Sequence, residues 1–91
     1  MDFTALFTKA RSSFERCIRA NSDLVSEINM PLDSLIPEDE WIKFQFLNVE
    51  DKHFDVEARL ALFAPNGDRI GYYCYHESDT GEFVDEFLVF D

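Results

Sequence analysis

The stretch that decides the fold is residues 54–91, which read FDVEARLALF, APNGD, RIGYYCYHE, SDTG and EFVDEFLVFD. Three runs rich in β-branched and aromatic residues alternate with two short segments of turn residues. Runs of this kind, separated by Gly, Pro, Asn and Asp, are typical of strands joined by tight turns. The stretch predicts a three-stranded antiparallel meander, and the rest of the chain has to be fitted to it.

The first of these runs has the clearest register. One face carries only apolar side chains, namely Phe54, Val56, Ala58, Leu60 and Leu62. The other face carries Asp55, Glu57 and Arg59. A slip by one residue would bury all three charges, so the register is well specified.

The faces of the other two runs are less evenly marked. In residues 69–77 we expect Ile70, Tyr72 and Cys74 to share the buried face, with Tyr73 and Tyr75 on the reverse. The last run, residues 82–90, is largely apolar on both faces. Its buried side stays open.

Residues 3–20 predict an amphipathic helix. Apolar side chains recur there at steps of three and four, namely Phe3, Leu6, Phe7, Ala10, Phe14, Cys17 and Ile18. We expect the helix to end at Asn21, which tolerates the left-handed conformation. Residues 22–28 can form a short helix after a break, and Pro37 followed by the acidic residues 38–40 suits a single helical turn.

Residues 41–49 predict one further strand, with Ile42, Phe44 and Phe46 on one face and Trp41 on the other. The expected architecture is therefore a single α+β domain over residues 1–91. It consists of a helix at about 3–20, a connector at 21–40, and a four-stranded antiparallel β-meander at 41–91. The helix stripe and the apolar face of residues 54–62 should bury each other.

The charge excludes several classes of function. The formal net charge is −11, and the sequence pI is about 4.3. Nucleic-acid binding and attraction to anionic lipid both need a basic surface, so neither is expected. Residues 1–20 hold four basic and two acidic residues, whereas residues 21–91 hold four basic and seventeen acidic ones. The sheet region therefore carries the acidic excess, which favours a basic partner.

No apolar run approaches the length of a membrane span, and the N-terminal residues do not resemble a signal peptide. Two cysteines, Cys17 and Cys74, are too few for a disulfide scaffold, and we expect both to be core thiols. These features predict a cytoplasmic protein.

Nothing in the sequence spells a catalytic or metal site. His53 and His76 have no placed nucleophile beside them and fit surface positions in a turn and at a strand end. The acidic clusters lack the loop pattern that calcium needs, so we interpret them as solvent-exposed surface. We therefore predict no enzyme activity, no cofactor and no metal.

The predicted sheet face away from the helix is the candidate site. Aromatic side chains mixed with carboxylates resemble a binding hot spot, in which rings supply buried area and charges steer the partner. The residues predicted to bind a partner are Trp41, Asp55, Glu57, Tyr73, Tyr75, Asp85 and Glu86. A homodimer through this face, or cover by the chain's own connector, are the alternatives.

In size, charge and class the chain resembles the immunity proteins and antitoxins that bacteria make against basic toxins, often nucleases. The resemblance rests on no motif. It implies that Asp55, Glu57, Asp85 and Glu86 meet a partner's basic residues, while Trp41, Tyr73 and Tyr75 anchor the contact. The alternative is a small, acidic, dimeric secretion chaperone for an effector protein, although the second long helix of such chaperones is missing.

Overall fold

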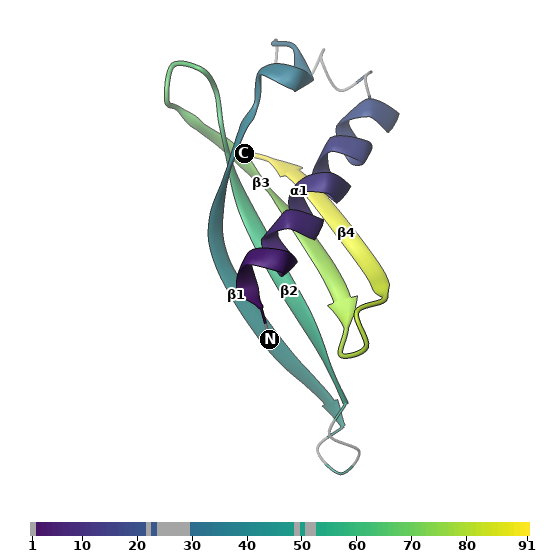
Figure 1. Cartoon of the computed structure of the whole chain (residues 1–91). Helices are drawn as coiled ribbons and strands as arrows, with labels where there is room; N and C mark the ends of the chain where they lie inside the picture. Colours follow the sequence, from purple (N-terminus) through teal and green to yellow (C-terminus); the bar gives the residue numbers. More distant parts are fainter. Residues whose placement is uncertain (1, 22, 24–29, 49, 51–52) are drawn as a thin grey trace.

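In the computed structural model, one N-terminal helix packs on a four-stranded antiparallel sheet, so the predicted α+β fold is confirmed (Figure 1). The structure describes residues 2–21, 23, 30–48, 50 and 53–91. The elements are α1 (Phe3–Ala20), a 3-10 helix η2 (Leu32–Ser34), β1 (Ile36–Asn48), β2 (His53–Phe63), β3 (Arg69–Ser78) and β4 (Phe83–Phe90). Consecutive strands pair in the order β1-β2-β3-β4, which leaves β1 and β4 as the edges.

Helix α1 has the predicted bounds. The Asp2 carboxylate caps its first turn by accepting hydrogen bonds from two backbone N–H groups. The side chains that it buries are Leu6, Ala10, Ser13 and Phe14. The helix ends at Asn21 as expected, although Asn21 does not use the left-handed conformation that it tolerates, since its φ is −123°. Instead, Asn21 Nδ2 donates to the Cys17 carbonyl, 2.8 Å away, and satisfies an acceptor of the last turn.

Strand β1 starts five residues earlier than the predicted 41. The helical turn expected at residues 37–40 is wrong, because Pro37 pairs with Leu62 and Asp39 with Leu60 in the antiparallel ladder. Proline is tolerated there because β1 is an edge strand and needs no donor on its outer side. The short helix expected at residues 22–28 lies mostly outside the described residues.

The core lies between α1 and the sheet. The predicted register of β2 is confirmed, because Val56, Ala58, Leu60 and Leu62 are all fully buried beneath the helix. Ile42 of β1 pairs with Ala58 and joins the same face, also as predicted. Because this face is buried, the side chains of β2 that alternate with it must lie on the opposite face.

The predicted faces of β3 are wrong, and a β-bulge beside the hairpin is the reason. Phe63 pairs with Arg69, but Leu62 pairs with Gly71, so β3 carries one extra residue at this point. Beyond the bulge, Tyr73 lies opposite Leu60 and Tyr75 opposite Ala58. Without it, Leu60 would have faced Tyr72, as the sequence pattern suggested. A single inserted residue therefore exchanges the two faces of β3.

The open question about β4 is settled by its partners in β3. Leu88 and Phe90 lie on the helix side, whereas Phe87 and Val89 lie on the reverse. The two strands approach closely at Gly71, where an added Cβ would overlap the Val89 carbonyl oxygen. Glycine is required here because any larger residue would push β4 away from β3.

Two ion pairs tie the basic helix to the acidic sheet. Lys9 Nζ lies 3.2 Å from Glu77 Oε2 of β3, and Arg11 Nη2 lies 2.5 Å from Asp39 Oδ1 of β1. Part of the helix's positive charge is therefore used within the fold. The β1–β2 hairpin runs past the N-terminal end of α1, which makes the molecule elongated, with extents of 47 × 22 × 21 Å (Figure 1).

Candidate functional site

The sheet face turned away from α1, here called the open face, is not covered by any described element (Figure 1). The residues of the open face are identified by their strand pairing with Arg59, Glu57 and Asp55 of β2. They include Trp41, Lys43, Gln45, Asp55, Glu57, Arg59, Ala61, Tyr72, Cys74, His76, Asp85, Phe87 and Val89. The open face therefore mixes rings with charges, as the sequence predicted in kind but not residue by residue.

The centre of the open face is an arginine lying against two rings. Arg59 Cζ is 4.6 Å from the centroid of the Trp41 ring and 3.8 Å from that of Tyr72. These cation–π contacts each contribute about 0.5–1 kcal/mol at partly exposed sites. Arg59 Nε is buried and has no hydrogen-bond partner within the described part of the chain. The contacts hold both rings in fixed positions on an otherwise uncovered sheet.

A histidine–glutamate pair lies beside this centre. His76 Nε2 is 2.5 Å from Glu57 Oε1, yet the geometry does not make a hydrogen bond, and Nε2 has no such partner among the residues described. The His76 ring packs edge-on against Phe87, with centroids 5.4 Å apart. A shallow hollow of about 40 Å³ lies beside the pair, lined by Lys43, Gln45, Asp55, Glu57 and His76. His76 is therefore part of the open face and does not mark a strand end.

A second arginine is already neutralised. Arg69 of β3 binds Glu40 of β1 with two parallel contacts, Nη1 to Oε1 at 2.6 Å and Nη2 to Oε2 at 3.1 Å. Its hydrogen bonds hold the pKa of Glu40 below the usual value. With Arg59 stacked on rings and Arg69 paired, the carboxylates Asp55 and Asp85 outnumber the exposed Lys43 in the charge that this face presents to a partner.

The proximity of Cys74, His76 and Glu57 raises the question of thiol chemistry. Cys74 is only 2% exposed, and burial raises the pKa of its thiol. A nucleophilic cysteine needs the opposite, an accessible thiolate with a lowered pKa. In the described ranges, no group of three or more His, Cys, Asp and Glu side chains is placed to hold a metal ion.

The predicted site residues divide between the two sides of the sheet. Trp41, Asp55, Glu57 and Asp85 lie on the open face, where they were expected. Tyr73, Tyr75 and Glu86 lie on the helix side, so the face predicted for these three is wrong. The bulge at the β2–β3 hairpin explains both tyrosines. Buried at 0% and 5% exposure, neither tyrosine ring is available to anchor a partner.

Tyr73 instead links α1 to β4. Its hydroxyl oxygen lies 2.7 Å from Ser13 Oγ and 3.1 Å from Glu86 Oε1. A carboxylate only accepts, so Tyr73 donates to Glu86 and the Ser13 hydroxyl donates to Tyr73. Burial, followed by the Glu86 charge, raises the pKa of Tyr73. Tyr75 donates to Glu77 Oε2 at 2.9 Å, and burial raises its pKa to about 12.

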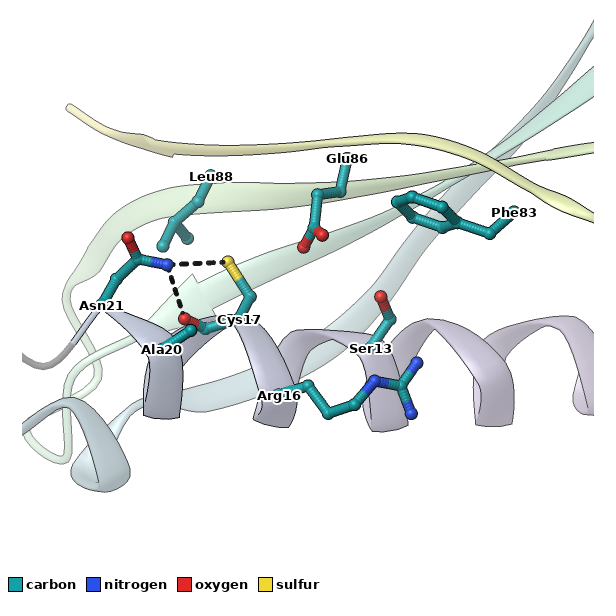
Figure 2. Close-up of a pocket in the computed structure, with 8 residues that line it drawn as sticks. All are labelled: Ser13, Arg16, Cys17, Ala20, Asn21, Phe83, Glu86 and Leu88. Carbon is teal, nitrogen blue, oxygen red and sulfur yellow. Dashed lines mark hydrogen bonds between the residues drawn. The ribbon is translucent and has the colours of Figure 1, made fainter.

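A groove of about 480 Å³ separates the C-terminal half of α1 from β4 (Figure 2). It is lined by Ser13, Arg16, Cys17, Ala20, Asn21, Phe83, Glu86 and Leu88. Burial and the nearby Glu86 raise the pKa of the Cys17 thiol to about 11. Cys17 and Cys74 are both free and lie on opposite sides of the sheet, so the expected core position of Cys74 beneath the helix is wrong.

Sequence reasoning missed Arg59, Tyr72 and His76 as members of this face. The alternation of β2 places Arg59 on the correct face, but the sequence pattern assigns it no role there. A register that includes the bulge would have shown Tyr72 and His76 on the side of Arg59. No local residue pattern signals that bulge, because the PNGD turn fits a hairpin with or without it.

Comparisons with known proteins found no matching family model, no similar curated protein and no similar solved structure. Within the part of the chain that the structure describes, no helix is long and apolar enough to cross a membrane.

Proposed function

We propose that this chain is a non-catalytic protein-binding domain that neutralises a basic partner, in the manner of bacterial immunity proteins and antitoxins. The observation that carries the proposal is the open face, where the fixed rings of Trp41 and Tyr72 lie among the carboxylates Asp55, Glu57 and Asp85. Rigid aromatic side chains supply most of the binding energy in many interfaces. Surrounding charges mainly set the association rate and the choice of partner.

The charge of the whole chain supports the same proposal. A net charge of −11 attracts basic proteins over long range, and a toxin that acts on nucleic acid carries a basic cleft. On the open face, Arg59 and Arg69 are stacked or paired within the fold. A basic partner would therefore meet the carboxylates Asp55, Glu57 and Asp85 against the single exposed lysine Lys43 among the described residues of this face.

The experiment measures association with a partner that copurifies with the tagged chain from its source cells. A variant that combines Asp55→Asn, Glu57→Gln and Asp85→Asn should slow association by about tenfold at low salt, because electrostatic steering is weakened. The association rate of the unaltered chain should fall as salt is added.

A control variant removes three charges away from the open face, by Glu15→Gln, Asp33→Asn and Asp68→Asn. It has the same net charge as the first variant, and its association rate should stay within about twofold of the unaltered chain. Equal slowing by both variants would show that overall charge, and not the open face, drives binding. No slowing by either would overturn the proposal.

A further inference from the structure

The outer edge of β4 offers backbone groups to a partner. Asp91 N–H donates to the Ile70 carbonyl, 2.9 Å away, in register with the β3–β4 ladder. In an antiparallel pair, every second residue bonds to the neighbouring strand. By this alternation, the N–H and C=O groups of Glu86, Leu88 and Phe90 point away from β3. Among the described residues, no strand pairs with this edge.

The two edges of the sheet differ in how they are protected. β1 carries Pro37, an exposed Lys43 and two register shifts, all of which discourage pairing with another chain. β4 (Phe83–Phe90) reads FVDEFLVF, with no proline or lysine, and its one register shift lies at the end nearest the hairpin. Phe83, Val84 and Phe87 are about half exposed. Of the two edges, only β4 is left suitable for strand addition.

The α1–β4 groove lies directly inside this edge. Glu86 and Leu88, whose peptide groups face outward, also line the groove together with Ser13 and Cys17 of α1 (Figure 2). Side chains of a strand added to β4 would project beside those of Glu86 and Leu88, because neighbours in a sheet share a face. The groove, at about 480 Å³, gives such side chains room beneath the flank of the helix.

Charge decides which kind of segment fits. Residues 82–91 contain Glu82, Asp85, Glu86 and Asp91 and no basic residue. A second copy pairing through β4 would set this acidic strand against itself, and like charges directly opposite destabilise a sheet. The Glu86 carboxylate inside the groove accepts a hydrogen bond from an uncharged group, the Tyr73 hydroxyl. Among the described residues that line the groove, Arg16 is the only basic one.

We propose that an extended segment of the partner, bearing lysine or arginine, pairs with the outer edge of β4 as a fifth strand. Backbone hydrogen bonds would supply affinity, and basic side chains facing Asp85 and Glu86 would supply specificity. The inference rests on the proposed function only for the basic nature of the partner. It adds where the partner binds and in which conformation.

The test uses the full chain and a capped heptapeptide that alternates lysine and valine as the probe. The peptide should slow amide hydrogen exchange at Glu86 and Leu88, whereas a peptide of alternating glutamate and valine should not. A lysine–valine peptide methylated on its backbone nitrogens keeps the charge but cannot pair. Its binding should be at least about tenfold weaker, because several backbone hydrogen bonds are lost.

A matched pair of protein variants locates the edge. Semisynthesis with ligation at Cys74 can place one N-methyl group on Leu88, which removes an outward N–H and leaves the β3 ladder intact. This variant should stay folded and bind the peptide about tenfold less tightly. Glu86→Gln should also weaken binding, and the glutamate–valine peptide should remain inactive.

Equal binding of the N-methylated peptide would overturn the inference and indicate surface charge attraction only. A dimer of the chain alone with protected β4 amides would also overturn it, in favour of a second copy. In one outcome, the peptide pairs with β4 while the partner's association rate is unchanged by the replacement of Asp55, Glu57 and Asp85. That result would overturn the proposed function and leave the edge site in place. If the partner's association depends on these carboxylates but the peptide does not pair with β4, the open face stands as the binding site and the edge site is overturned.

Discussion

Replacing Leu60 with alanine should lower the free energy of unfolding by about 3 kcal/mol, the usual cost of a large cavity in a tight core. Leu60 is fully buried in the centre of β2, with Tyr73 opposite it on β3. The surrounding rings cannot collapse into the space, since Tyr73 is held by Ser13 and Glu86. Urea unfolding followed by circular dichroism measures the loss.

Trp41→Ala is the matched comparison, because it removes a larger side chain from the open face. Trp41 is only half-buried, and its ring stacks against Arg59. The expected cost is about 1 kcal/mol, the value of a partly exposed cation–π contact with its packing. If Trp41→Ala destabilised the chain as much as Leu60→Ala, the open face would be a second core covered by something in the chain itself.

The part of the fold that periodicity controls could be predicted from the sequence. The apolar stripe of α1 and the strict alternation of β2 each leave one arrangement that buries no charge. The open face could be predicted in kind, through Trp41, Asp55 and Glu57, because these residues lie in strands with clear alternation.

Other parts depend on contacts between distant residues. The bulge that turns Tyr73 and Tyr75 toward the helix depends on how β2 and β3 fit together. No local sequence pattern indicates it. Pro37 and the acids after it favour a helix start, yet pairing with Leu60 and Leu62 extends β1 through them. The edge strand β4 carries apolar side chains on both faces, so its sequence does not reveal which face is buried.

Raising the pH through the alkaline range should unfold the protein well before its backbone chemistry is affected. Burial raises the pKa of Tyr75 from about 10 to about 12 and that of Cys17 from about 9 to about 11, and it also raises the pKa of Tyr73. In the unfolded chain these groups lose their protons at lower pH, so high pH favours unfolding. Their stabilising effect is complete below pH 9 and is lost as the pH rises through about 11 and 12.

The loss from Tyr75 alone is roughly 2–3 kcal/mol when the pH exceeds its folded pKa, since each unit corresponds to about 1.4 kcal/mol. Urea unfolding at a series of pH values measures it. Tyr75→Phe and Tyr73→Phe keep the rings and remove the titrating groups. Each should therefore lower stability slightly at neutral pH and flatten its decline at high pH. An unchanged decline in both variants would contradict the buried positions assigned to these hydroxyls.

Under the proposed function, the partner binds the open face. The most direct measurement places a photo-crosslinking phenylalanine analogue at position 41 or position 87 on that face, and at the exposed position 12 on α1 as the control. Irradiation in the source cells should attach the same basic protein to the chain from positions 41 and 87, and nothing from position 12. Crosslinking from position 12, with none from 41 or 87, would show that the partner binds the helix side and would contradict the account.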